Sequence, residues 1–248
     1  TSIENLKSNI IEIVNMYTQK YDEEFNRFLQ PFIMKIWALL TKSQEAPRFD
    51  ILVFTGINFL TTIARRAQTQ EIFGVDDPNT NEPIKQIFTN VIVPNTKLRE
   101  SDIENFEDNP DEFIRADLEG SDTDTRRKAA SDLIKALSEY FEKTMTTLAG
   151  SYIKTLMDAY SSSNSGSNDE FGFLAKEAAL FLVTSLITKK QTRKLGVTEV
   201  SNLVNLQQFF DDNIFNEIAQ PMDRINPVLQ ASCIKFIIHF RNQIGKER

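Results

Sequence analysis

Cysteine and histidine are almost missing from this 248-residue chain, which has one of each. A single cysteine cannot form an internal disulfide, which is typical of proteins in a reducing compartment such as the cytosol or nucleus. The sequence has no Cys/His cluster with metal-ligand spacing, and its acidic pairs lack the spacing of an EF-hand loop. Cys233 and His239 both fall in an apolar helical stretch, where we expect structural side chains.

Glycine and proline are also scarce, with eight of each. This disfavours an all-β fold with many tight turns and favours helices joined by modest loops. No glycine-rich phosphate loop is present. With no positioned nucleophile, base or metal site in view, we expect a protein that is not an enzyme.

Long apolar runs are missing as well. The longest clean run, residues 178–183, is far shorter than the roughly 20 residues of a membrane-spanning helix. The first residues show no signal-peptide pattern, and they begin without Met, so we expect a piece of a longer protein. A net charge of −7 disfavours nucleic acid, whose recognition needs a basic surface. We therefore expect neither a membrane nor a nucleic acid as partner.

Apolar residues do recur with helical spacing along almost the whole chain. The first such stripe comprises Ile3, Leu6, Ile10, Val14 and Tyr17. Residues 189–196 read as a basic helix end followed by glycine. No convincing run of period-two alternation is found, so the sequence predicts an all-α fold.

The helices also repeat with a long period. Helices with a similar role are expected to begin near Ser2, Phe49, Thr125, Phe171 and Pro227. Most of these starts are separated by roughly the HEAT or armadillo period, with one partner helix between them. The pattern predicts an α-α superhelix, or solenoid, in which residues 1–248 form a central segment of about five helix pairs.

One interval is too long, because residues 94–124 form an insert within one repeat. From Glu100 to Asp124 there are eleven acidic residues and a single basic one, Arg115. A charge run of this kind is commonly a solvated loop. However, apolar residues such as Phe106 and Phe113 are interleaved with the acids, and Pro110 is suited to open a short helix with acids in its first turn. We therefore expect an ordered acidic element that faces a basic partner.

Several stretches resemble one family. They are Val91–Asn95 (VIVPN), Phe106–Asn109 (FEDN), Glu112–Arg115 (EFIR), and Asp117–Asp122 (DLEGSD) leading to Thr125–Arg127 (TRR). Together with Leu203–Leu206 and Phe240–Gln243, they resemble the importin-β superfamily of nuclear transport receptors, and within it the export receptors for importin-α. The resemblance covers essentially the whole chain, and the acidic insert followed by the arginine pair is its most discriminating part.

The resemblance implies a HEAT superhelix that binds Ran-GTP and the cargo importin-α cooperatively in the nucleus and releases both after GTP hydrolysis in the cytoplasm. It implies no cofactor of the chain's own, since the GTP is carried by Ran. It also implies shuttling between nucleus and cytoplasm, with room for contacts to nuclear pore proteins. The acidic residues that it offers as Ran contacts are Glu107, Asp108, Asp111, Glu112, Asp117, Glu119, Asp122 and Asp124.

The basic residues around the insert have a different expected role. Arg115, Arg126 and Arg127 are candidates for a hinge or for structural ion pairs. For Arg126 and Arg127 we favour helix capping and internal pairing with Asp122 or Asp124.

Other functions remain open at this point. An importin of the same superfamily is one alternative, and an unrelated HEAT scaffold that binds a basic protein is another. The sign of coupling separates them, because Ran-GTP raises cargo affinity in an exporter, lowers it in an importer and leaves a scaffold unaffected.

Overall fold

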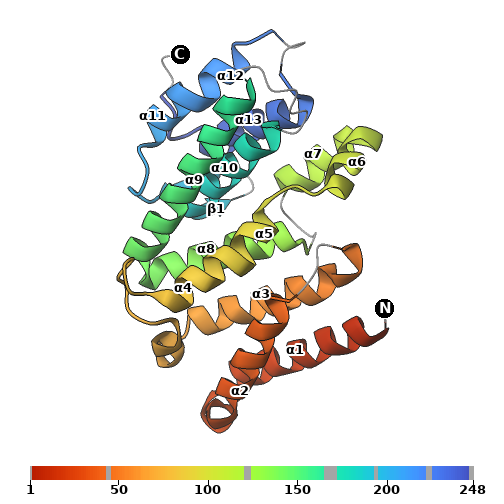
Figure 1. Ribbon diagram of the computed structural model, residues 1–248, viewed down its shortest axis with the longest axis vertical. Coiled ribbons are helices and arrows are strands. Elements are labelled where there is room, and N and C mark those ends of the chain that lie inside the picture. The colour runs from red at the N-terminus through yellow and green to blue at the C-terminus, as the bar shows by residue number, and fades with distance from the viewer. Residues whose placement is uncertain are drawn as a thin grey trace. The chain divides into compact units, whose positions relative to one another are not determined.

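The computed structural model describes residues 2–42, 46–119, 124–164, 172–192, 195–221 and 225–245 (Figure 1). Most of these residues are helical, so the all-α prediction is confirmed, with one exception given below. Long helices begin at Ser2, Asp50, Arg126, Gly172 and Pro227, each within one residue of an expected start. The chain divides into two compact units, one made of residues 1–96 and 124–148 and the other of residues 97–123 and 149–248.

The first unit is a set of stacked helices. In chain order they are α1 (Ser2–Lys20), α2 (Asp22–Leu40), η1 (Pro47–Phe49), α3 (Asp50–Ala64), η2 (Ala67–Phe73), α4 (Glu82–Ile87), the π-helix η3 (Phe88–Ile92), α5 (Val93–Thr96), α8 (Arg126–Tyr140) and the start of α9 (Glu142–Asn164). Helix α3 packs against α1 on one side and α8 on the other (Figure 1). It is therefore apolar nearly all round, as expected of a central helix.

Two local features of α3 allow this close packing. The hydroxyls of Thr55 and Thr61 donate to carbonyls one turn earlier in α3, so these buried polar groups are satisfied. Gly56 lies where α2 approaches α3, and a Cβ there would come within 2.9 Å of the Leu40 side chain.

Helix α1 uses a different face for packing than its apolar stripe indicates. Ser8, Ile11, Val14 and Thr18 are buried, whereas Ile3 and Leu6 of the stripe are 64% and 60% exposed. Only Val14 belongs to both sets. The partner helix α3 therefore selects a face that helical periodicity alone did not identify.

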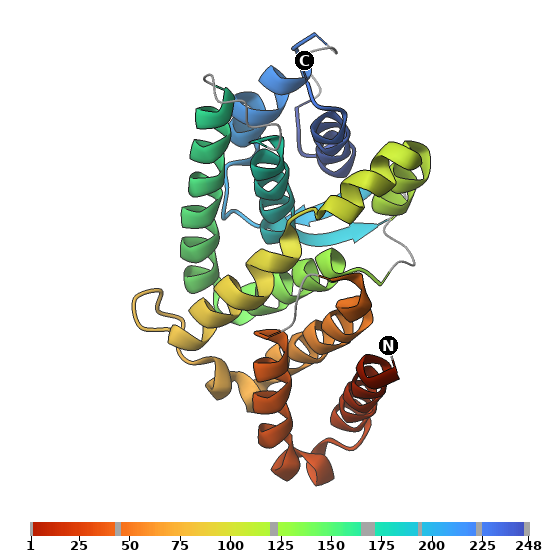
Figure 2. The ribbon, with the colours of Figure 1, turned by 45° about the vertical axis from the view of Figure 1, so that its right-hand side comes forward.

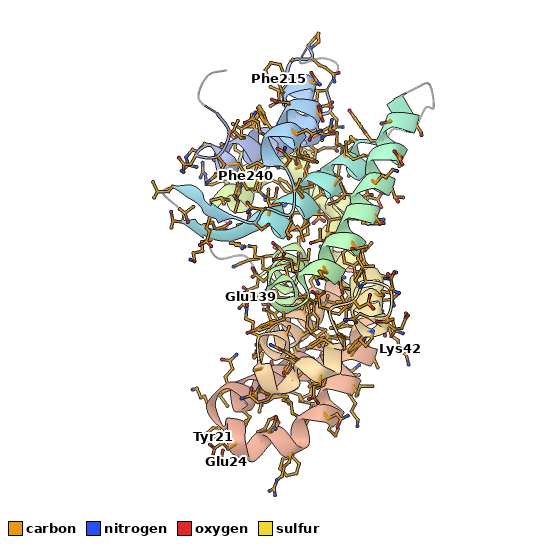
Figure 3. All side chains as sticks on the ribbon, turned by 90° about the vertical axis from the view of Figure 1, so that its left-hand side faces the viewer. Tyr21, Glu24, Lys42, Glu139, Phe215 and Phe240 are labelled. Carbon is orange, nitrogen blue, oxygen red and sulfur yellow. The ribbon has the colours of Figure 1, made fainter. Side chains whose placement is uncertain are left out.

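The second unit contains α6 (Glu100–Asp108), α7 (Pro110–Glu119), the rest of α9, α10 (Gly172–Ile187), β1 (Thr188–Thr192), β2 (Gly196–Val200), α11 (Leu206–Phe210), the π-helix η4 (Asp211–Phe215), α12 (Asn216–Ile218) and α13 (Pro227–Phe240). Its core lies where α10 packs on α13 and includes Leu180, Val183, Cys233 and Phe240. Phe240 is fully buried there, whereas Phe215 is 48% exposed; both are labelled in Figure 3.

The strands β1 and β2 form an antiparallel hairpin, visible as the two arrows in Figure 2. The expected basic helix end at residues 189–196 is therefore wrong, since α10 stops at Ile187. Val197 is completely buried in the core, and its carbonyl accepts a hydrogen bond from the Gln243 side chain at 2.9 Å. Gly196 has φ of 72°, and a Cβ there would lie 2.7 Å from the His239 carbonyl oxygen. Contacts with the end of α13, distant in sequence, thus favour the hairpin.

The helices in the described part of the chain include none with the length and apolar character needed to cross a membrane.

Candidate partner-binding surface

The acidic segment folds into two short helices, α6 and α7, which lie side by side (Figure 1). The start of α6 is capped by Asp102, whose Oδ2 accepts the Arg99 backbone N–H at 2.8 Å. Helix α7 begins at Pro110 with Asp111 and Glu112 in its first turn, as the sequence predicted. Acids at these positions are favoured by the positive end of the helix dipole.

The inner side of this acidic hairpin, defined as α6 and α7, is apolar. Phe106 and Phe113 meet edge to face, with ring centroids 5.5 Å apart. Together with Ile103 and Ile114 they pack on residues of α10 and α13, namely Phe173, Leu174, Val228 and Ala231. The interleaved apolar residues therefore anchor the acidic hairpin to the core of the second unit. Leu118 of α7 is a further apolar residue of this segment, but its side chain lies outside the described residues.

The outer side carries the charge. Glu104, Glu107, Asp108, Asp111 and Glu112 are all exposed. The acids cannot turn inward because the aromatic residues occupy the packed side, and a buried carboxylate without a partner is costly. The result is a fixed acidic surface, and surfaces of this kind generally speed association with basic partners and make it sensitive to salt.

Glu107 and Asp108 occupy an unfavourable place for folding. They lie in the last turn of α6, which contains no basic residue. Negative charge near a helix C-terminus is destabilising by several tenths of a kcal/mol, about 0.3–1. The dipole of α6 therefore does not favour acids at these two positions.

The structure brings together four of the predicted Ran contacts, Glu107, Asp108, Asp111 and Glu112. Asp117 and Glu119 belong to α7, but their side chains are outside the described residues, as is the whole of Asp122. Asp124 is exposed just before α8 and belongs to the first unit. Arg115 is exposed on α7.

Arg126 and Arg127 are built into the first unit. Arg126 is only 8% exposed; its Nε lies 2.6 Å from Asp50 Oδ1, and its Nη2 donates to the Ala46 carbonyl. Arg127 Nε donates to the Thr96 carbonyl at 3.0 Å. This fits the structural role that we favoured. Among the described residues Arg126 pairs with Asp50 and not with Asp124, whereas Asp122, the other expected partner, lies outside the described residues. Helix α8 packs on α3, so its first turn meets Asp50 at the start of α3.

A buried polar network in the second unit had no signal in the sequence. Lys176 of α10 and Glu217 of α12 form an ion pair with an N–O distance of 2.5 Å, and both side chains are 6% exposed. The Tyr160 hydroxyl of α9 donates to the same carboxylate at 2.8 Å. Because the partners are 41 and 57 residues apart, only the tertiary structure shows that they join three helices.

Catalysis would use features of the described residues such as a metal-binding group or a reactive cysteine. No group of three or more His, Cys, Asp and Glu side chains among them is arranged to hold a metal ion. Cys233 is fully buried, and burial raises the pKa of its thiol to about 12. Such a thiol stays protonated at neutral pH and is a poor nucleophile. The ordered, exposed charge of the acidic hairpin makes it the strongest candidate functional surface among the described residues.

Comparisons with known proteins match essentially the whole chain to one family. A family model described as Cse1 matches residues 1–248. Exportin-2 of Homo sapiens is 42% identical over 245 residues, which is 99% of this chain and 24% of that protein. Exportin-2 of Danio rerio is 40% identical over 246 residues, again 99% of this chain and 24% of that protein. The chain thus spans about a quarter of the length of these relatives.

A solved structure shows the same fold. It is described as the exportin Cse1 in its cargo-free, cytoplasmic state; the TM-score is 0.88 and the identity 36%, over 98% of this chain and 25% of that chain. The predicted helical-repeat class and the predicted family resemblance are confirmed by these matches.

Proposed function

The chain belongs to the Cse1 family, and from this we propose that it is a central segment of a nuclear export receptor that carries importin-α to the cytoplasm in a cooperative complex with Ran-GTP. The observation that supports the proposal best is the identity of 42% to Exportin-2, which extends over 99% of the chain and so includes the acidic hairpin. The complete receptor, rather than this segment alone, would perform export.

Cooperativity in such a receptor is a coupling free energy between two ligands of one deformable solenoid. Each ligand raises the affinity for the other by the same factor, because linkage is reciprocal. Helical repeats suit this task, since each repeat contacts only its neighbours and small changes between repeats accumulate. Hydrolysis of the GTP on Ran would remove one ligand and release the other. The receptor itself needs no cofactor, and it would shuttle between nucleus and cytoplasm with contacts to nuclear pore proteins.

The acidic hairpin is proposed as a contact for Ran. Glu107, Asp108, Asp111 and Glu112 lie on one rigid element whose opposite side is held by Phe106 and Phe113. A surface that is already ordered loses little conformational entropy on binding. Asp117, Glu119, Asp122 and Asp124 are proposed as further contacts on the ground of their charge and sequence position.

The test uses the full-length receptor. Importin-α affinity is measured alone, with saturating Ran-GTP and with Ran-GDP, at two salt concentrations. Enhancement by Ran-GTP only is expected for an exporter. A decrease with Ran-GTP would identify an importer, and no nucleotide dependence would leave a general HEAT scaffold.

The role of the acidic hairpin is tested by reversing four charges: Glu107→Lys, Asp108→Lys, Asp111→Lys and Glu112→Lys. The matched control reverses four other exposed acids, Glu24, Glu71, Glu139 and Asp158, the first and third of which are labelled in Figure 3. Reduced Ran-GTP affinity and a shallower salt dependence are expected only for the acidic hairpin. Equal effects from both sets would remove the acidic hairpin from the proposal without affecting the exporter assignment.

A further inference from the structure

The β-hairpin of β1 and β2 carries a basic stretch that a helix dipole does not explain. Lys189 and Lys190 were predicted at a helix C-terminus, where basic residues are favoured, but they lie in β1. A two-stranded sheet has only a small dipole of its own. Both side chains are exposed, and in the described part of the chain β2 is the only strand paired with β1 (Figure 2). The basic stretch is therefore accessible from outside the molecule.

These two lysines stand three and two residues before a hydroxyl residue, in the sequence Lys189-Lys190-Gln191-Thr192. The chain has five pairs of adjacent basic residues, at 65–66, 126–127, 127–128, 189–190 and 193–194. Only the pair at 189–190 has a serine or threonine as the second residue after it. Basic residues at these two positions are what basic-directed protein kinases bind, through carboxylates in the substrate groove.

Thr192 differs from the other threonines of the β-hairpin. It ends β1 with an exposed side chain, and its hydroxyl oxygen accepts the Leu195 backbone N–H at 3.1 Å. Thr188, at the other end of β1, is 4% exposed and donates its hydroxyl to the Thr184 carbonyl at 2.7 Å. Thr198 of β2 is exposed, but no basic pair precedes it. Thr192 thus combines the basic pair with an accessible hydroxyl.

The backbone around Thr192 suits a kinase groove, which holds the residues before the hydroxyl as an extended segment. Residues 188–192 are already extended. Their pairing with β2 is irregular, because the register leaves Lys189 of β1 and Thr198 of β2 as extra residues without an opposite partner. A short ladder with such irregularities opens locally at low cost in free energy.

We propose that Thr192 is a phosphorylation site for a protein kinase that selects basic residues before the acceptor. In this reaction Thr192 Oγ1 forms a bond to the γ-phosphorus of ATP, while the bond from that phosphorus to the β,γ-bridging oxygen breaks and ADP leaves. The hydroxyl proton passes to the catalytic base of the kinase. The ATP and the catalytic groups are supplied by the kinase, and this chain supplies the acceptor and the two lysines.

A phosphate on Thr192 would change the charge of the β-hairpin. It carries about −1.5 to −2 at neutral pH, which offsets the two lysines of β1. Thr192 and Lys190 share a face of β1, because the extra residue between their pairs, Thr198, lies on β2. The ion pair of Lys190 with Glu199 is 73% and 47% exposed, so it contributes little and can be exchanged for the phosphate. A basic surface would become an approximately neutral one.

The site is tested on the full-length, folded protein with the catalytic subunit of cyclic-AMP-dependent protein kinase, which selects two basic residues at these positions. Mass spectrometry of the peptides is expected to find phosphate on Thr192. Thr192→Ala should remove this signal, whereas Thr198→Ala, in the same β-hairpin, should keep it. Absence of phosphate on Thr192 would overturn the proposal, and so would phosphate that appears there only after the protein is unfolded.

The role of the lysines has its own test. Lys189→Ala/Lys190→Ala is expected to lower kcat/KM for Thr192 at least about tenfold, and Lys189→Arg/Lys190→Arg to keep or raise it, since a guanidinium pairs with carboxylates through two hydrogen bonds. Lys20→Ala/Lys42→Ala is the matched control, because it removes two exposed lysines elsewhere. An unchanged rate in the first variant would contradict the proposal. Neither experiment uses Ran or cargo, so failure here is distinguishable from failure of the proposed function.

Discussion

Arg126 Nε and Asp50 Oδ1 lie 2.6 Å apart and join the first residue of α8 to the first residue of α3. The Arg126 side chain is 8% exposed, whereas that of Asp50 is 35% exposed, so the arginine is the more deeply buried partner of the pair. The family resemblance placed this arginine beside the acidic insert. Its contacts instead stabilise the stack of α3 on α8.

Arg126→Ala is expected to lower the free energy of unfolding by about 2–4 kcal/mol, because it removes a mostly buried cation and leaves the Ala46 carbonyl and Asp50 without this donor. Arg115→Ala is the control, since Arg115 is exposed and should contribute less than about 1 kcal/mol. Denaturant unfolding measures both. A loss of Ran affinity with unchanged stability would instead make Arg126 a contact residue.

Phe106→Ala is expected to release the acidic hairpin from the second unit. Phe106 is 8% exposed and is central to the cluster that joins α6 and α7 to α10 and α13. Truncating a buried phenylalanine costs about 3–5 kcal/mol. Hydrogen exchange should therefore accelerate in α6 and α7, while α3 and α8 keep their protection. Glu107→Gln on the exposed side is the control and should leave exchange unchanged.

Lys176→Met alone is expected to destabilise the protein by about 3–5 kcal/mol, because Glu217 would remain as a buried charge without its main partner. The double variant Lys176→Met/Glu217→Leu should recover most of that loss. A double-mutant cycle by thermal or denaturant unfolding measures the coupling. Additive losses would show that the two side chains stabilise the protein independently.

Cys233 gives a prediction about pH. Burial raises the pKa of its thiol from an ordinary value of 9.0 to about 12. The stabilisation associated with the protonated thiol is complete below pH 9 and decreases as the pH rises toward 12, because the unfolded thiol ionises first. Stability should fall less steeply above pH 9 in Cys233→Ala. At pH 8 a thiol reagent should react with the native protein far more slowly than with the unfolded protein; rapid native labelling would contradict the burial.

Much of this architecture was predictable from local pattern. The helical periodicity and the scarcity of glycine and proline indicated an all-α repeat protein. Pro110 followed by two acids indicated where α7 begins, and Cys233 on an apolar stripe was expected to be structural. These predictions hold because helix formation, helix starts and amphipathicity depend on residues within a few turns of one another.

Other features depend on partners that are distant in the sequence. The hairpin at residues 188–200 forms because Val197 enters a core with α13, although the lysines of β1 had suggested a helix end. Arg126 pairs with Asp50 rather than with its neighbour Asp124. Lys176 forms an ion pair with Glu217, which is 41 residues away in the sequence.

Helix α1 shows most clearly which features the local sequence determines and which depend on tertiary packing. The sequence by itself determined that α1 is a helix with apolar residues on more than one side, since its 3.6-residue period sets which side chains share a face. It did not determine which of those faces meets α3. That choice follows from the shape of the packed neighbour and from the burial of Ile11 and Val14, a free energy that exists only when the helices come together.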